Sequence, residues 1–161
     1  MNKEQTMKLT RIGVIAAAIL AVTTVAWAQK PDFSGTWTLD PASAPAGGGG
    51  RGGGALGNGP ATVKQTADAL TIERTMGDAK VTLTYKLDGT ESRNMMMGRG
   101  GQQADSLSTA RWDGSKLTIV TKQEMGGQIT ESTQVWALEG STLTVETTNA
   151  RGTQKRIYKK S

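Results

Sequence analysis

The feature that most constrains the fold of this chain is an alternation of apolar and polar residues that runs from Ala110 to Thr148 and is interrupted only by turn residues. Three segments carry it: ARWDGSKLTIVTK, ITESTQVWALEG and STLTVETT. A period of two is typical of strands with one buried face, and such short connections allow only antiparallel neighbours. The pattern predicts an antiparallel up-and-down meander, and most of the remaining chain resembles it.

The turn dipeptides predict how these strands pair. Asp113-Gly114 favours a two-residue hairpin loop, because it tolerates positive φ angles. This loop would place Trp112 opposite Ser115. Glu139-Gly140, interpreted in the same way, puts one set of residues on a common face: Gln134, Trp136, Leu138, Leu143 and Val145. The two hairpins are therefore expected to direct Trp112 and Trp136 into a shared interior.

The N-terminus has the pattern of an export signal. Basic residues precede an apolar run from Ile12 to Val25, which ends in Ala26-Trp27-Ala28. This order matches a secretory signal peptide with an A-x-A cleavage site. The run is shorter than the roughly 20 residues that a spanning helix needs, so no stable membrane anchor is expected. We predict that residues 1–28 are cleaved and that the protein is periplasmic or secreted.

The mature chain, residues 29–161, has the length of a single domain. Removing residues 1–28, which carry a net charge of +2, lowers the formal charge from +5 to +3. This mild basicity argues against nucleic acid as a partner. The sequence contains no Cys and no His, so it lacks disulfides, the usual general base and the commonest metal ligand. No cofactor and no metal are expected, and the sequence leaves the oligomeric state open.

The first mature strand is expected over residues 33–39, where Phe33, Gly35 and Trp37 alternate with polar residues. Residues 41–60 then break the pattern with many glycines. Such a composition predicts a flexible surface loop, because it offers almost nothing to bury.

Strands are expected again at 62–66, 69–75 and 79–87, followed by a hairpin at Asp88-Gly89. In this register Tyr85 shares a face with Ser92 and Asn94 on the next strand. Apolar residues would thus meet polar ones, which a packed core avoids. A lumen containing water or ligand would accept this arrangement, and so would a frayed sheet edge.

Three consecutive methionines, Met95–Met97, invite comparison with a Cu(I) site, because thioethers are soft ligands. Neighbouring strand residues point to opposite faces, however, so Met96 would not converge with its neighbours. Flexible apolar contact by Met96 is the favoured interpretation.

The last strand, residues 154–159, alternates Arg156 and Tyr158 with lysines. If the lysines face water, then Arg156 and Tyr158 face inward. Burial statistics alone favour the opposite arrangement, with Ile157 in the core and Arg156 at the rim.

The two ends of the mature chain resemble those of the lipocalin and fatty-acid-binding-protein (calycin) superfamily. Phe33-x-Gly35-x-Trp37 is similar to the strand that opens the barrel in that family, and Arg156-x-Tyr158 is similar to the inward-facing pair that grips a ligand carboxylate. The whole chain resembles small lipocalin-like bacterial exported proteins. The resemblance implies an all-β, closed or partly open lipocalin-like barrel of about eight to ten strands. The sequence departs from the family pattern between the first and second strands, where residues 47–59 stand in place of the family's two short portal helices.

These patterns lead to a main functional hypothesis: an exported, non-enzymatic barrel that binds a small apolar or amphipathic molecule, with anionic molecules included. The ligand-binding candidates are Trp37, Tyr85, Asn94, Met96, Trp112, Trp136, Arg156 and Tyr158. The alternative is a solid barrel that acts in the cell envelope as an interaction or inhibitor module, through surface loops. An enzyme is not favoured, because no nucleophile elbow or paired carboxylates can be found.

Overall fold

The computed structural model describes residues 29–44, 54–97, 103–125 and 127–161; the predicted signal peptide lies outside them. The described chain forms ten strands and one short 3₁₀ helix, η1 (Pro41–Ser43). The strands are β1 (Gly35–Leu39), β2 (Ala61–Gln65), β3 (Ala69–Met76), β4 (Ala79–Lys86), β5 (Glu91–Met97), β6 (Gln103–Asp113), β7 (Lys116–Met125), β8 (Gln128–Glu139), β9 (Thr142–Asn149) and β10 (Gly152–Lys160).

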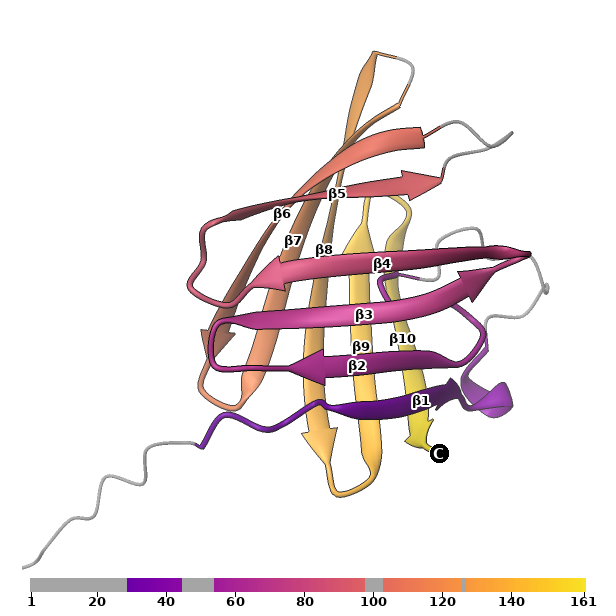
Figure 1. Ribbon diagram of the computed structural model, residues 1–161, viewed down its shortest axis with the longest axis vertical. Helices are drawn as coiled ribbons and strands as arrows, with labels where there is room; N and C mark the ends of the chain where they lie inside the picture. The colour runs from indigo at the N-terminus through magenta and orange to yellow at the C-terminus, as the bar shows by residue number, and fades with distance from the viewer. Residues whose placement is uncertain (1–28, 45–53, 98–102, 126) are drawn as a thin grey trace, which may run out of the picture.

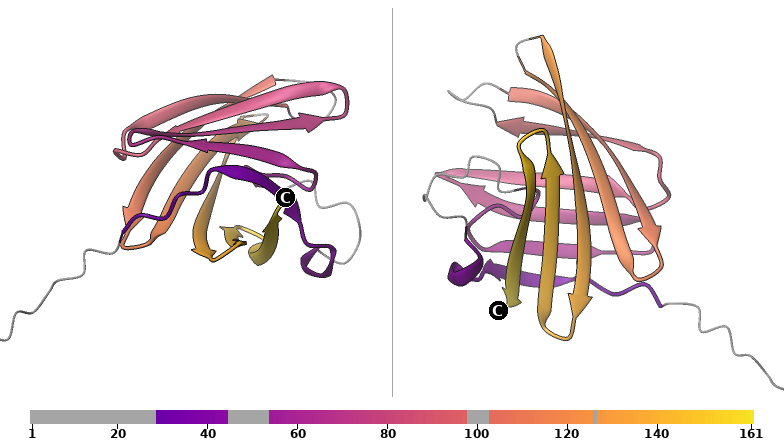
Figure 2. Two further views of the ribbon diagram at one scale, coloured as in Figure 1. Left: turned by 60° about the horizontal axis from the view of Figure 1, so that its bottom comes forward. Right: turned by 180° about the vertical axis from the view of Figure 1, so that it is seen from behind.

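All ten strands belong to one antiparallel sheet in the order β4-β3-β2-β1-β10-β9-β8-β7-β6-β5. Strands that are neighbours in sequence pair with each other, except β4 and β5, and β1 also pairs with β10, which bends the sheet back on itself. Figure 1 shows β1–β4 crossing β7–β10 at a steep angle, and Figure 2 shows the same crossing from behind. The predicted all-β, up-and-down architecture is confirmed as a nearly closed barrel. The described residues include no helix long and apolar enough to span a membrane.

The barrel closes between β4 and β5 through side chains instead of a backbone ladder. The amide group of Asn94 accepts from the Thr84 N–H at 2.7 Å and donates to the Thr84 carbonyl at 3.0 Å. The Ser92 hydroxyl accepts from the Lys86 N–H at 2.8 Å. The ladder predicted at Asp88-Gly89 is therefore wrong, because the described parts of β4 and β5 are joined by these side-chain bonds and lie at opposite ends of the sheet order. We call this junction the seam.

The hairpin between β6 and β7 pairs in a register two residues away from the predicted one. Trp112 lies opposite Leu117, not Ser115, and Asp113 pairs with Lys116. The loop is Gly114-Ser115, in which only Gly114 has a positive φ, as in a type II′ turn. A shift of two residues keeps the parity, so every side chain stays on its predicted face.

The interior is one continuous apolar cluster. Its largest fully buried side chains are Trp37, Trp136, Tyr158, Phe33, Leu56, Leu70, Ile72, Leu83, Leu117, Ile119, Leu143 and Val63. Most of these residues come from the alternating strand positions that the sequence assigns to the inner face. Leu56 does not, because it belongs to the segment that was predicted to be a surface loop.

Candidate ligand-binding site

Strand β10 directs Arg156 and Tyr158 into the barrel. Tyr158 lies opposite Leu143 and Arg156 opposite Val145, both of which are core residues of β9. Arg156 is 2% exposed and Tyr158 is 1% exposed. The prediction that this pair faces inward is confirmed, and the alternative with Arg156 at the rim is not observed.

Both side chains bind oxygen atoms of the protein itself. The Tyr158 hydroxyl donates to the Gly57 carbonyl at 2.8 Å. Arg156 donates through Nη1 to Asn58 Oδ1 at 3.0 Å and through Nη2 to Gln154 Oε1 at 3.1 Å. Two adjacent acceptors from residues 57 and 58 thus fill the place where the family resemblance puts a ligand carboxylate. Both acceptors are neutral, so the buried guanidinium has hydrogen bonds but no counter-charge here.

These acceptors belong to residues 54–60, which we call the inserted segment. Ala55 and Leu56 are each 1% exposed and are part of the core. The Ala55 N–H donates to Gln134 Oε1 at 3.4 Å. The prediction of a flexible surface loop over 41–60 is therefore wrong for residues 55–57, which are buried. Residues 58–60 are exposed, Pro41–Ser43 form a 3₁₀ turn without a buried residue, and residues 45–53 lie outside the described parts. The physical reason is that two apolar residues among the glycines can be buried at little steric cost.

Gly57 fits this position because it carries no side chain. Its φ is +73°, and a Cβ there would collide with Nη1 of Arg74. The guanidinium of Arg74 thus packs directly on the backbone that Tyr158 binds. Arg74, Arg156 and Tyr158 therefore surround the same short piece of chain.

Arg74 was not among the predicted site residues. It follows Leu70 and Ile72 at alternate positions of β3, so its side chain points inward at the end of the strand. Its Nε is buried and has no hydrogen-bond partner in the described chain. The alternation Leu70-x-Ile72-x-Arg74 could have revealed this orientation, had it been extended beyond the apolar residues.

The phenols near the two arginines remain protonated well above neutral pH. Burial raises the pKa of Tyr85, although the Arg74 charge opposes this shift. Burial also raises the pKa of Tyr158, against the lowering effects of Arg156 and Arg74. Both residues are therefore hydrogen-bond donors at physiological pH. The cluster thus combines two guanidiniums with the neutral hydroxyl group of Tyr158.

Two of the predicted tryptophans lie in the packed interior. Trp37 is fully buried and donates through Nε1 to the Phe33 carbonyl at 2.8 Å. Trp136 is fully buried and donates to Gln134 Oε1 at 3.2 Å. Phe33, which the predicted site did not include, meets the Trp136 ring edge-on at 5.6 Å. The N–H group of each indole already donates a hydrogen bond within the protein. The two rings therefore form part of the apolar wall of the interior and have no donor left for a ligand.

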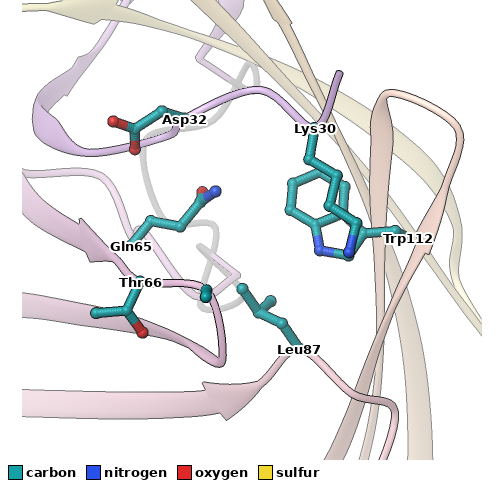
Figure 3. A pocket seen from close by; sticks show the side chains of 7 residues that line it. Lys30, Asp32, Gln65, Thr66, Leu87 and Trp112 are labelled. Atoms are coloured by element: carbon teal, nitrogen blue, oxygen red, sulfur yellow. The ribbon is translucent and has the colours of Figure 1, made fainter. Parts of the chain in front are cut away.

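Trp112 lies away from Arg156, at the end of the barrel that contains the β2–β3 and β4–β5 turns. Its ring stacks on Phe33 at 5.8 Å, and Lys30 Nζ lies 5.6 Å from its centroid. Figure 3 shows Trp112 in an open pocket of about 300 Å³, lined by Lys30, Asp32, Gln65, Thr66, Ala67, Leu87 and Trp112. A meander places the inserted segment at the opposite end, so this pocket is separate from the Arg156 cluster.

Asn94 and Met96 lie on the inner face of β5, as predicted. Both polar atoms of the Asn94 amide are engaged in the seam, so this side chain joins two strands. Met96 is partly buried and packs on the core, whereas Met95 is 56% exposed. The side chain of Met97 lies outside the described parts. Within the described residues no cluster of three or more acidic, His or Cys side chains could hold a metal ion.

Comparison with known proteins identifies the class of fold. No family model matches the chain, and no curated protein sequence matches it. Solved structures do match: a REP1-NXSQ fatty acid transporter has a TM-score of 0.55 at 15% identity, covering 80% of this chain and 95% of that one. Human cRBP IV has a TM-score of 0.54 at 22% identity, covering 81% and 99%. Secretory abundant heat soluble protein 4 from Ramazzottius varieornatus has a TM-score of 0.52 at 22% identity, covering 80% and 94%.

These similarities, at low sequence identity, define the fold. The described residues form a ten-stranded barrel with a calycin-like fold, and the structures that share this fold include a protein named as a fatty acid transporter. In this chain the inserted segment lies on Arg156 and Tyr158.

Proposed function

We propose that this protein is an exported, non-enzymatic binding protein for a small amphipathic molecule with an anionic head group. The proposal rests on one observation: the buried side chains of Arg156 and Tyr158 donate hydrogen bonds to two adjacent acceptor oxygens that the chain itself supplies. A carboxylate or a similar anion offers the same two acceptors together with the missing negative charge. The proposal agrees with the name of the fatty acid transporter that shares the fold.

Ligand binding then requires an exchange. Ala55 and Leu56 fill part of the apolar interior. Beside them, Gly57 and Asn58 accept the hydrogen bonds of Tyr158 and Arg156. An amphipathic ligand has the same sequence of parts, an apolar body followed by acceptor oxygens. The inserted segment must therefore leave when the ligand enters, and the apparent affinity is reduced by the cost of releasing it.

The test is calorimetric titration of mature protein with decanoate and with decanol, which lacks the charge. Arg156→Gln should weaken decanoate about 10- to 100-fold and leave decanol nearly unchanged, since a charge-assisted hydrogen bond contributes about 1.5–3 kcal/mol. Arg93→Gln is the matched control, because Arg93 is on the outer face with a 71% exposed side chain. Equal weakening of both ligands by Arg156→Gln would refute the assigned role of Arg156.

Export is proposed from the N-terminal sequence alone. Intact-mass measurement on protein from a bacterial periplasmic fraction should give the mass of residues 29–161, and an unprocessed mass in the cytosol would refute export.

A second candidate function is a solid barrel that acts through its surface, and the burial of Leu56 favours it. In that case the inserted segment is a permanent part of the core. Neither decanoate nor decanol would then bind, and the melting temperature would not rise with either.

A further inference from the structure

The charge distribution inside the barrel limits the kind of head group that fits. In the described strands, every Asp and Glu occupies an outward-facing position. Several of them pair with cations on the outer surface, as Glu73 does with Lys64 and Lys80, and Asp105 with Arg93. The sequences of the gaps 45–53, 98–102 and 126 contain no acidic residue. The inner face of the described strands thus supplies no carboxylate to balance the cations that lie on it.

Two of those cations converge on the inserted segment. Arg156 binds Asn58, and Arg74 packs on Gly57, the neighbouring residue. The structure contains no salt bridge to either arginine within the described residues. Burial lowers the pKa of Arg74, while the nearby phenols Tyr85 and Tyr158 oppose this shift. An arginine stays protonated under such shifts, so the cluster carries two positive charges.

A monocarboxylate would balance only one of these charges. A phosphate monoester carries about −1.5 to −2 charges near neutral pH and offers three acceptor oxygens. It would therefore match the two guanidiniums in charge and offer one acceptor oxygen each to Arg74, Arg156 and the Tyr158 hydroxyl. Its tetrahedral oxygens can also be reached from two different strands, as the positions of Arg74 on β3 and Arg156 on β10 require.

We propose that the ligand head group is a phosphate monoester, bound between Arg74 and Arg156 with the Tyr158 hydroxyl as an additional donor. This inference rests on the proposed amphiphile-binding function and names its ligand class. Arg74 is the residue that distinguishes a dianion from a monoanion, whereas Arg156 contributes to the binding of either. The apolar interior binds the alkyl part of the ligand.

The test compares ligands of one chain length: decyl phosphate, decyl sulfate and decanoate, titrated calorimetrically at pH 8, with inorganic phosphate as a fourth ligand. Decyl phosphate should bind at least about tenfold more tightly than decyl sulfate, which has the same shape but one charge. It should also bind more tightly than inorganic phosphate, which lacks the alkyl chain. At pH 5.5, where the phosphate is largely a monoanion, its advantage over the sulfate should shrink.

Arg74→Gln should remove the preference for phosphate and leave decyl sulfate within about threefold of its original affinity, since Arg156 is retained. Arg74→Lys keeps the charge and should retain most of the preference. Circular dichroism of each variant checks that the barrel is folded, and Arg93→Gln is the outer-face control.

The outcomes separate the two proposals. Equal affinities for the three anions, or an Arg74→Gln effect of the same size on all of them, would overturn the dianion inference while amphiphile binding stands. Binding of inorganic phosphate as tightly as decyl phosphate would overturn the requirement for an alkyl part. A protein that binds none of the four ligands would overturn both proposals.

Discussion

Replacing Leu56 should make the protein less stable and, at the same time, a better binder. Leu56 is 1% exposed and is the largest apolar group that the inserted segment places in the core. Buried Leu→Ala changes cost about 2–5 kcal/mol, and a value near 2 applies here because flanking glycines let the segment resettle. Since only the docked form of the segment contains this contact, Leu56→Ala lowers the free energy of unfolding and the cost of releasing the segment by the same amount.

The gain in affinity follows from the lower cost of releasing the inserted segment. A release cost lower by about 2 kcal/mol raises the apparent affinity about 30-fold, provided that the docked form still predominates in the variant. Urea unfolding measures the first quantity, and calorimetric titration with decyl phosphate or decanoate measures the second. Leu117→Ala, which removes a fully buried core residue of β7, is the control that should lose stability without gaining affinity. If Leu56→Ala lost stability with unchanged or weaker binding, the displacement mechanism would be refuted.

Two further predictions concern the phenols and the seam. The sequence contains only two tyrosines, and burial raises the pKa of both Tyr85 and Tyr158. Their stabilising contribution is fully present below the unfolded-state pKa of about 10 and is lost as the pH rises through the folded-state values. Absorbance at 295 nm should therefore show less tyrosinate in native than in unfolded protein at pH 10.5, whereas half-ionisation near pH 10 without unfolding would contradict this burial. Asn94→Ala should lower stability by about 1–2 kcal/mol in urea, because two hydrogen bonds to Thr84 are lost. The Thr84 amide should then exchange faster with deuterium while the Lys86 amide keeps its protection, and unchanged exchange at Thr84 would rule out a role for Asn94 in the seam.

The sequence predicts most of the barrel because a period of two is a local property. Strand β3, for example, was expected from its alternating apolar residues, and it begins at the predicted residue, Ala69. Hairpin register was harder to predict, because it depends on which residue of a turn takes the positive φ. In the β6–β7 turn that residue is Gly114 in the first loop position, so the register differs by two residues while the faces are preserved.

The seam and the inserted segment could not be predicted from local patterns. Asp88-Gly89 is a typical hairpin dipeptide, but no backbone ladder follows it in the described strands. Instead, the side chains of Asn94 and Ser92 on β5 accept hydrogen bonds from backbone N–H groups of β4. The inserted segment appears featureless among its glycines, and its burial depends on interior space that strands far away in sequence create. Leu56 in particular has no neighbours in sequence that reveal a buried face. The inward orientation of Arg74, by contrast, could have been predicted from the same alternation that identifies Ile72 as a core residue.

The central claim is that the ligand head group replaces Gly57 and Asn58 as the partner of Tyr158 and Arg156. The most direct test is a crystal structure of the mature protein saturated with decyl phosphate. We expect phosphate oxygens within hydrogen-bonding distance of Arg156 and Tyr158, with the Asn58 amide and the Gly57 carbonyl moved away from them. A fully occupied complex in which Arg156 still binds Asn58 and Tyr158 still binds Gly57 would contradict it.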